Sequence, residues 1–226
     1  MSEQAYIAPR GIESTLSTNK VLKNTYLLLS MTLLVSATAA WASTAMEVSR
    51  VTALMCSLAA LAIVWFVLPR VAKSAAGLPV VFLFTGLLGF SLGPVLNHYL
   101  AMDNGSQIIM QTLGATAAVF LILSGYVLTT RKDFSFMRGF LITGLIVLLL
   151  AILAYIIAGF FGVQMSGVFL AINAVGVLLF SGFILYDTSR IIHGGEQNYI
   201  MATVALYLDI HNLFTSLLHL IGFADD

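Results

Sequence analysis

Long apolar runs without a charged residue alternate with short polar segments along most of this chain. The first four charge-free runs lie at 25–45, 51–68, 79–100 and 108–128. A fifth, at 139–186, is too long to cross a hydrocarbon core of about 30 Å only once, at a helical rise of about 1.5 Å per residue. The glycine-rich stretch at 159–167 predicts a turn that divides it into 139–158 and 168–186.

A last segment, 200–223, is less uniform because it contains Asp209, His211 and His219. The runs are continuously apolar and do not alternate, which predicts helices and not the strands of a membrane barrel. We therefore expect an all-α membrane protein, a seven-helix transmembrane bundle in which six helices surround a central, semi-polar last helix.

Composition agrees with a lipid environment. Hydrophobic residues make up 60% of the 226 residues and charged residues 9%, whereas soluble domains carry about 25% charged residues. The formal net charge is zero, so the basic footprint of a nucleic-acid partner is missing. The single cysteine, Cys56, lies in an apolar run and is expected to be a packing residue.

The predicted organisation is a polar cytoplasmic tail at 1–19 followed by one seven-helix transmembrane domain at 20–226. The small residues at 37–42 would suit a signal peptidase after Lys20 and Lys23. The first run is nevertheless long enough to span and is followed by further spans, which favours an uncleaved first helix.

Basic residues predict the orientation. With seven spans, one side holds nine of the ten basic residues: Arg10, Lys20, Lys23, Arg70, Lys73, Arg131, Lys132, Arg138 and Arg190. The other side holds only Arg50. Because basic loops stay in the cytoplasm, the N-terminus is expected there. The rule is silent after Arg190, so a re-entrant last segment stays an alternative to a full span that would place Asp225 and Asp226 outside.

Two acidic residues stand within the apolar segments. Asp187 ends the sixth run and Asp209 lies inside the last one, and an ionisable residue within a span is by default a functional candidate. Each is eleven residues from Asn198, in the turn between the two segments. In an antiparallel hairpin they would therefore lie at equal depth on facing helices.

Two carboxylates at such a place would titrate as one unit and share a proton over part of the pH range. They could sense pH or contact a hard cation such as Ca²⁺ through their oxygens. Simpler interpretations are that Asp187 pairs with Arg190 one turn later, and that Asp209 hydrogen-bonds within the bundle beside Asn212. Arg70 and Lys73 are possible counter-charges, although either could serve only as a topology anchor.

Other patterns favour structural roles. The segment 89–93 matches G-x-S-x-G, but that motif needs a strand-to-helix turn, and here it lies within a span before Pro94. Several glycines predict close helix contacts: Gly86, Gly89, Gly93, Gly176 and Gly182. Two aspartates within spans also suggest an intramembrane aspartyl protease, but Asp209 lacks the Gly-x-Gly that precedes the second aspartate of those enzymes. The four histidines show no metal-ligand spacing.

Four segments carry a resemblance to a known family. The segments 16–26, 126–136, 191–196 and 206–214 resemble the Bax inhibitor-1 family of seven-helix membrane proteins. The likeness is strongest to bacterial members that bind the membrane AAA protease FtsH and slow its degradation of membrane proteins. Related bacterial members are associated with a pH-sensitive calcium leak, gated by two aspartates on the last two helices and an arginine near the second.

By motif, Asp187 and Asp209 match that pair, and Arg70 is the best match for the arginine, although Pro69 precedes it. The resemblance implies a non-enzymatic protein of the bacterial inner membrane, with lipid and the FtsH complex as partners. It implies no resident cofactor, with Ca²⁺ at most a permeant or transiently bound ion at Asp187 and Asp209. Three hypotheses follow: a protease modulator, a pH-gated cation leak and, least supported, an intramembrane hydrolase.

Overall fold

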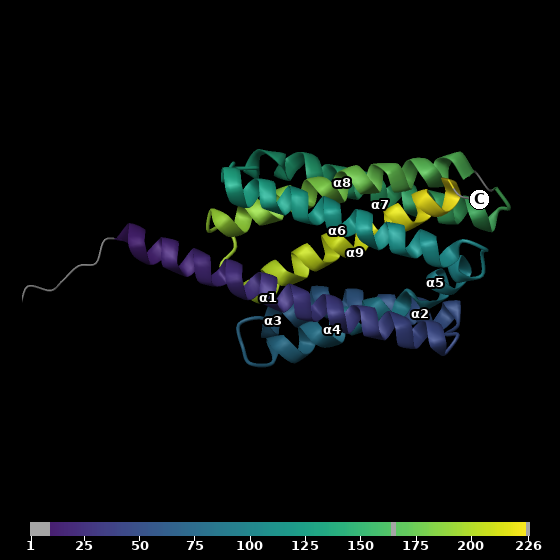
Figure 1. Cartoon of the computed structure of the whole chain (residues 1–226), viewed down its shortest axis with the longest axis horizontal. Coiled ribbons are helices and arrows are strands. Elements are labelled where there is room, and N and C mark those ends of the chain that lie inside the picture. Colours follow the sequence, from purple (N-terminus) through teal and green to yellow (C-terminus); the bar gives the residue numbers. More distant parts are fainter. Residues whose placement is uncertain (1–9, 164–165, 225–226) are drawn as a thin grey trace, which may run out of the picture.

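The computed structural model describes residues 10–163 and 166–224, and most of this part of the chain is helical (Figure 1). In chain order the elements are α1 (Arg10–Ala45), α2 (Arg50–Ala62), the π-helix η1 (Ile63–Val67), α3 (Leu68–Val71), α4 (Gly77–Ser91), α5 (Gly93–Leu100), α6 (Gly105–Thr130), the 3-10 helix η2 (Ser135–Met137), α7 (Arg138–Phe160), α8 (Ser166–Ile192) and α9 (Tyr199–Ala224). Joined where they continue one another, they give seven helices long and apolar enough to cross a membrane. The predicted all-α, seven-helix class is confirmed.

The last helix, α9, lies between two layers of the bundle. Figure 1 shows α1, α2, α3 and α4 on one side and α6, α7 and α8 on the other, with α9 running obliquely between them. In the most apolar 18-residue stretch of α9, half of the residues are buried, whereas one third or fewer are buried in the corresponding stretch of every other span. The predicted central, semi-polar last helix is therefore confirmed. Its main neighbours are α1, α4, α6 and α8, whereas α2 packs on α4 and α7 packs on α8.

The second span changes its helical winding before Pro69. Proline has no backbone N–H and its ring clashes with the carbonyl four residues earlier. The chain meets this with the π-helical turn of η1 before α3 resumes at Leu68. Arg70 donates a hydrogen bond from Nη1 to the Phe66 carbonyl, so its guanidinium bonds to its own helix.

Small residues let the third span approach the first. A Cβ atom at Gly89 would collide with the backbone of Ser36 in α1, and one at Gly93 would collide with Ser43. The hydroxyl of Ser91, between these glycines, donates to the Leu88 carbonyl at 2.7 Å. The G-x-S-x-G match is thus a helix-packing pattern, as predicted.

The remaining boundaries differ from expectation mainly at the two ends of the chain. A turn separates α7 from α8, as predicted, with Gly162 at φ 76°, while Gln164 and Met165 lie outside the described residues. The polar segment 10–19 continues α1 as helix, because extending an existing helix costs far less than starting one. The rest of the predicted tail, residues 1–9, and the terminal Asp225 and Asp226 also lie outside the described part.

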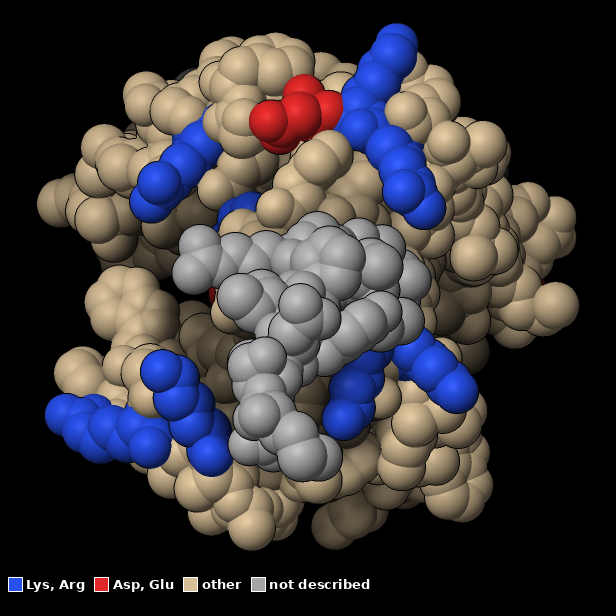
Figure 2. All heavy atoms as spheres, turned by 90° about the vertical axis from the view of Figure 1, so that its left-hand side faces the viewer, with Lys and Arg blue, Asp and Glu red and all other residues tan. Residues whose placement is uncertain are grey.

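Basic side chains gather at one end of the bundle, around the start of α1 (Figure 2). The turns after α3, α6 and α8 also lie at this end, which we call the basic end. It carries Lys20, Lys23, Arg70, Lys73, Arg131, Lys132, Arg138 and Arg190, whereas Arg50 begins α2 at the opposite end. The helices thus separate the basic residues as the sequence suggested, and the side of the membrane that each end faces stays a prediction.

Candidate functional site

The candidate site is built on the hairpin of α8 and α9. The helix α8 ends at Ile192, and Gly194 follows with φ 75°, a left-handed conformation that favours glycine. The N–H groups of Gly195 and Glu196 both donate to the Arg190 carbonyl, at 2.8 and 3.2 Å. This cap turns the chain back so that α9 runs antiparallel against α8.

The hairpin brings Asp187 and Asp209 together in the bundle interior. Their residues are 8% and 5% exposed, and their carboxyl groups lie close enough to interact with each other. The Oδ2 atom of Asp209 is buried without a hydrogen-bond donor. Because an ionised carboxylate only accepts hydrogen bonds, a proton on one of the two groups would supply the donor that the pair lacks. This arrangement can hold and exchange a proton.

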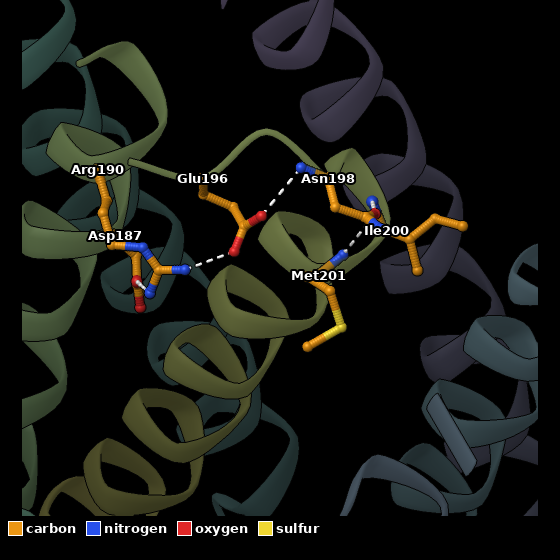
Figure 3. A network of polar contacts seen from close by, with 6 residues as sticks. All are labelled: Asp187, Arg190, Glu196, Asn198, Ile200 and Met201. Carbon is orange, nitrogen blue, oxygen red and sulfur yellow. Dashed lines mark hydrogen bonds and ion pairs between the residues drawn. The ribbon is translucent and has the colours of Figure 1, made fainter. Parts of the chain in front are cut away.

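Arg190 is the cation at this pair. Its Nη1 lies 3.3 Å from Asp187 Oδ1, one helical turn away. Asp187 therefore contacts both Arg190, which was the simpler alternative, and the second aspartate of the pair. The Nη2 of the same guanidinium lies 2.5 Å from Glu196 Oε2. Figure 3 shows Arg190 between these two carboxylates. The contacts of Arg190 with Asp187 and Glu196 are the only ion pairs among the described residues.

Asn198 connects Glu196 to the start of α9 (Figure 3) and also to the turn after α3. Its N–H donates to Glu196 Oε1 at 2.9 Å. Its side-chain oxygen accepts from the N–H groups of Ile200 and Met201, at 2.9 and 3.3 Å, and so caps the start of α9. Its side-chain amide donates to the carbonyl of Ala72, directly after α3, at 3.0 Å. The polar network therefore runs from Asp187 to the turn between the second and third spans.

Arg70 is not part of this network. The contact that joins it to Phe66 is exposed, and the counter-charge of Asp187 is Arg190. The Arg70 guanidinium instead binds the Phe66 carbonyl of its own helix. A gating role for Arg70 stays a prediction, and the geometry gives the neighbouring position to Arg190.

The pair offers few ligands for a resident metal ion. Calcium takes about six to eight oxygen ligands, and one of the four carboxylate oxygens here already contacts Arg190. Among the described residues no group of three or more acidic, histidine or cysteine side chains could hold a metal. The donor set does not fit a resident calcium site, although a passing cation could touch the two carboxylates.

Hydroxyl groups connect the neighbouring helices at the same level. Tyr26 of α1 and Ser124 of α6 share a hydrogen bond of 2.6 Å, and Ser124 shares another of 3.0 Å with Thr188, beside Asp187. At the end of α8, Ser189 accepts a hydrogen bond from the Phe134 N–H at 2.9 Å. These contacts hold α1, α6 and the loop before α7 against the hairpin.

The loop before α7 also carries charges, outside the spans. Hydrogen bonds from the backbone amide and hydroxyl of Ser135 lower the pKa of the Asp133 carboxyl. The pKa of Lys132 is raised by Tyr126, whose ring lies 5.6 Å from the ammonium. Both shifts hold these side chains in their charged forms near neutral pH, so neither accounts for a response in that range.

Sequence reasoning missed Glu196 and Asn198. Charged and amide side chains are common in loops, so neither residue was recognised as a candidate for the site. The available signals were an acidic residue across a Gly-Gly turn from Arg190 and an asparagine just before an apolar helix, which is a common N-cap pattern.

The fold and the site define a class: a seven-helix membrane protein with an acidic pair buried between its last two helices. The chain belongs to the Bax inhibitor-1 family, because residues 18–226 match the family model described as "Inhibitor of apoptosis-promoting Bax1".

Relatives of similar length support this membership. The chain is 52% identical to an "Uncharacterized membrane protein" of Vibrio cholerae, with 98% of this chain and 97% of the relative covered. It is 48% identical to "Modulator of FtsH protease YccA" of Escherichia coli, with 93% of each chain covered. A Pseudomonas aeruginosa protein is 45% identical, with 99% and 98% covered.

Proposed function

We propose that this chain is a regulatory protein of the bacterial inner membrane that binds the membrane protease FtsH and modulates its activity. The observation that carries the proposal is the 48% identity to Escherichia coli YccA along 93% of both chains. A related protein of another Escherichia coli strain, with the same identity, is named "Inner membrane protein YccA". A likeness that covers both chains in this way includes the loops and helix ends where a partner would bind.

The extended first helix supports this proposal. With 36 residues, α1 is the longest helix described and is about 54 Å long. Figure 1 shows that it projects past the other helices at the basic end. A polar helical extension outside the lipid is a surface that a protease complex can bind. The loops between the spans are short and offer less surface for binding.

Two measurements test the modulator proposal. The full chain, carrying an affinity tag, is isolated in mild detergent, and FtsH is expected to come with it at a level well above that of an unrelated seven-span protein. Deleting residues 2–15 is expected to lengthen the lifetime of the protein in cells and to slow the turnover of other FtsH substrates. Absence of FtsH from the isolated complex would contradict the proposal, and unchanged lifetime and turnover would remove the tail from the mechanism.

The acid pair favours a second candidate function, a pH-gated leak of cations such as Ca²⁺. Two facing carboxyls, one with a buried oxygen that lacks a donor, form a group whose hydrogen bonding changes when it takes up a proton. Such a local change can bias a two-state gate between packed helices. Protease binding does not require this pair, so the two functions are independent.

Replacing Asp209 by Asn tests the leak. Asparagine keeps the size and polarity of the side chain but does not titrate, so Ca²⁺ flux into proteoliposomes is expected to lose its dependence on pH between about 6 and 8. Asp103→Asn makes the same chemical change in a loop at the opposite end and should leave the flux unaltered. Wild-type protein that passes no Ca²⁺ at any pH would defeat the leak and leave the modulator proposal standing.

A further inference from the structure

One guanidinium serves two carboxylates at the end of α8. Arg190 reaches Glu196 at 2.5 Å and Asp187 at 3.3 Å, each with a different terminal nitrogen. The closer contact belongs to Glu196, which lies outside the helix, and the longer one to the buried Asp187 (Figure 3). The two carboxylates share one positive charge. Arg190 therefore stabilises the ionised form of each one less than it would if it contacted that carboxylate alone.

Glu196 is fixed in this competing position. Its second oxygen accepts the Asn198 N–H, and Asn198 is itself bound to Ala72 and to the start of α9. Glu196 and Asn198 also line a pocket of about 650 Å³ at the basic end, together with Lys73. Glu196 therefore lines the pocket while one oxygen of its carboxylate holds the counter-charge of the buried pair.

We propose that Glu196 sets the pH at which the acid pair exchanges its proton, by competing with Asp187 for Arg190. Glu196 is a positioning residue in this account, because it acts on the pair through Arg190. The inference rests on the second function proposed above, in which Asp187 and Asp209 exchange a proton.

The groups around the pair fix the direction of the effect. Asp187 faces Arg190 of its own helix, Asp209 of α9 and Glu196 of the connecting loop, and Tyr186 lies beside the guanidinium. The other neighbours reach this level with the uncharged hydroxyls of Tyr26 and Ser124. Removing the charge of Glu196 leaves Arg190 wholly to Asp187 and favours the ionised pair. Removing the charge of Arg190 does the opposite.

The test is infrared difference spectroscopy of the protonated-carboxyl band during a pH titration of the purified full chain. The band of the pair is the one that Asp209→Asn removes. Its midpoint in Glu196→Gln is expected to move to lower pH by roughly one unit, the size of effect that a nearby charge produces. Arg190→Gln should move it to higher pH. General damage to the fold would not shift two variants in opposite directions, and Asp103→Asn should leave the midpoint in place.

The outcomes separate the two proposals. If the wild-type chain shows no titrating band that Asp209→Asn removes, the proton-exchanging pair itself is wrong. If the band is present and Glu196→Gln leaves its midpoint unchanged, the pair stands and the role of Glu196 is overturned. Should Glu196→Gln fail to fold, Glu196→Asp decides, because it withdraws the carboxylate from Arg190 by one methylene. A smaller shift to lower pH supports the inference, and an unchanged midpoint overturns it.

Discussion

Asn198 links three parts of the molecule with one side chain. Its oxygen caps the first turn of α9 and its amide nitrogen binds the carbonyl of Ala72, while its backbone N–H holds Glu196. Asn104 occupies the corresponding place before α6 but makes no capping bond with its side chain. The same residue type therefore does different work at two helix starts.

This difference gives a direct comparison of stability. Asn198→Ala removes a cap and a bond between elements, and is expected to lower the free energy of unfolding by about 1–2 kcal/mol. Asn104→Ala is expected to cost about 0.5 kcal/mol or less, because no side-chain bond is lost. Reversible denaturation in detergent, followed by circular dichroism, measures both. Equal losses in the two variants would contradict the cap at Asn198.

Single residues were predictable where their chemistry conflicts with their surroundings. Asp187 and Asp209 stand out because a carboxyl within an apolar run is costly, and the hairpin does bring them together. Glu196 lies in a loop, where charge is the rule, and its importance depends on a turn geometry that spacing alone does not specify. Arg70 was chosen by its position after the second span and by resemblance, but its guanidinium binds the Phe66 carbonyl of its own helix.

At the scale of helices, the spans follow from apolar runs, and their irregularities follow from packing. The expected segments agree with the observed helices to within a few residues at most boundaries. The π-helical turn of η1 and the break between α4 and α5 were not predicted, because each depends on how a proline is accommodated against a neighbouring helix. Glycines at contacts were predictable as a group, but which ones touch a backbone was not.

Gly89 and Gly114 separate contact from composition. A Cβ at Gly89 would meet the backbone of Ser36, whereas a Cβ at Gly114 in α6 would meet nothing within 4 Å. Gly89→Ala is therefore expected to push α1 from α4 and to lower the free energy of unfolding by about 1–3 kcal/mol. Gly114→Ala should be neutral or raise it by up to about 1 kcal/mol, because alanine favours helix. Denaturation in the same detergent tests both, and a neutral Gly89→Ala would show that the helices separate at no cost.

On the scale of the whole molecule, α9 packs between the two layers of the bundle and contacts both. It contacts α1 and α4 on one side and α6 and α8 on the other, and it is a continuous helix of 26 residues, about 39 Å long. A helix of this length can cross the membrane fully, which favours a full span over the re-entrant alternative. The start of α1 and the end of α9 lie at opposite ends of the bundle (Figure 1).

Membrane orientation follows from the charges at those two ends. Eight basic residues from residue 20 onward lie at the basic end, and Arg50 lies at the other. Since basic loops are retained in the cytoplasm, the basic end is expected to face the cytoplasm, with the end of α9 on the periplasmic side. A reporter that is active only in the periplasm should therefore be inactive when fused at residues 5 and 135 and active at 103 and 163. A fusion after Ala224 should also be active, because seven full spans leave the two ends of the chain on opposite sides. Activity at residue 135 would show that the orientation is the reverse of the one expected. Inactivity after Ala224 together with activity at 163 would show that α9 does not cross the membrane.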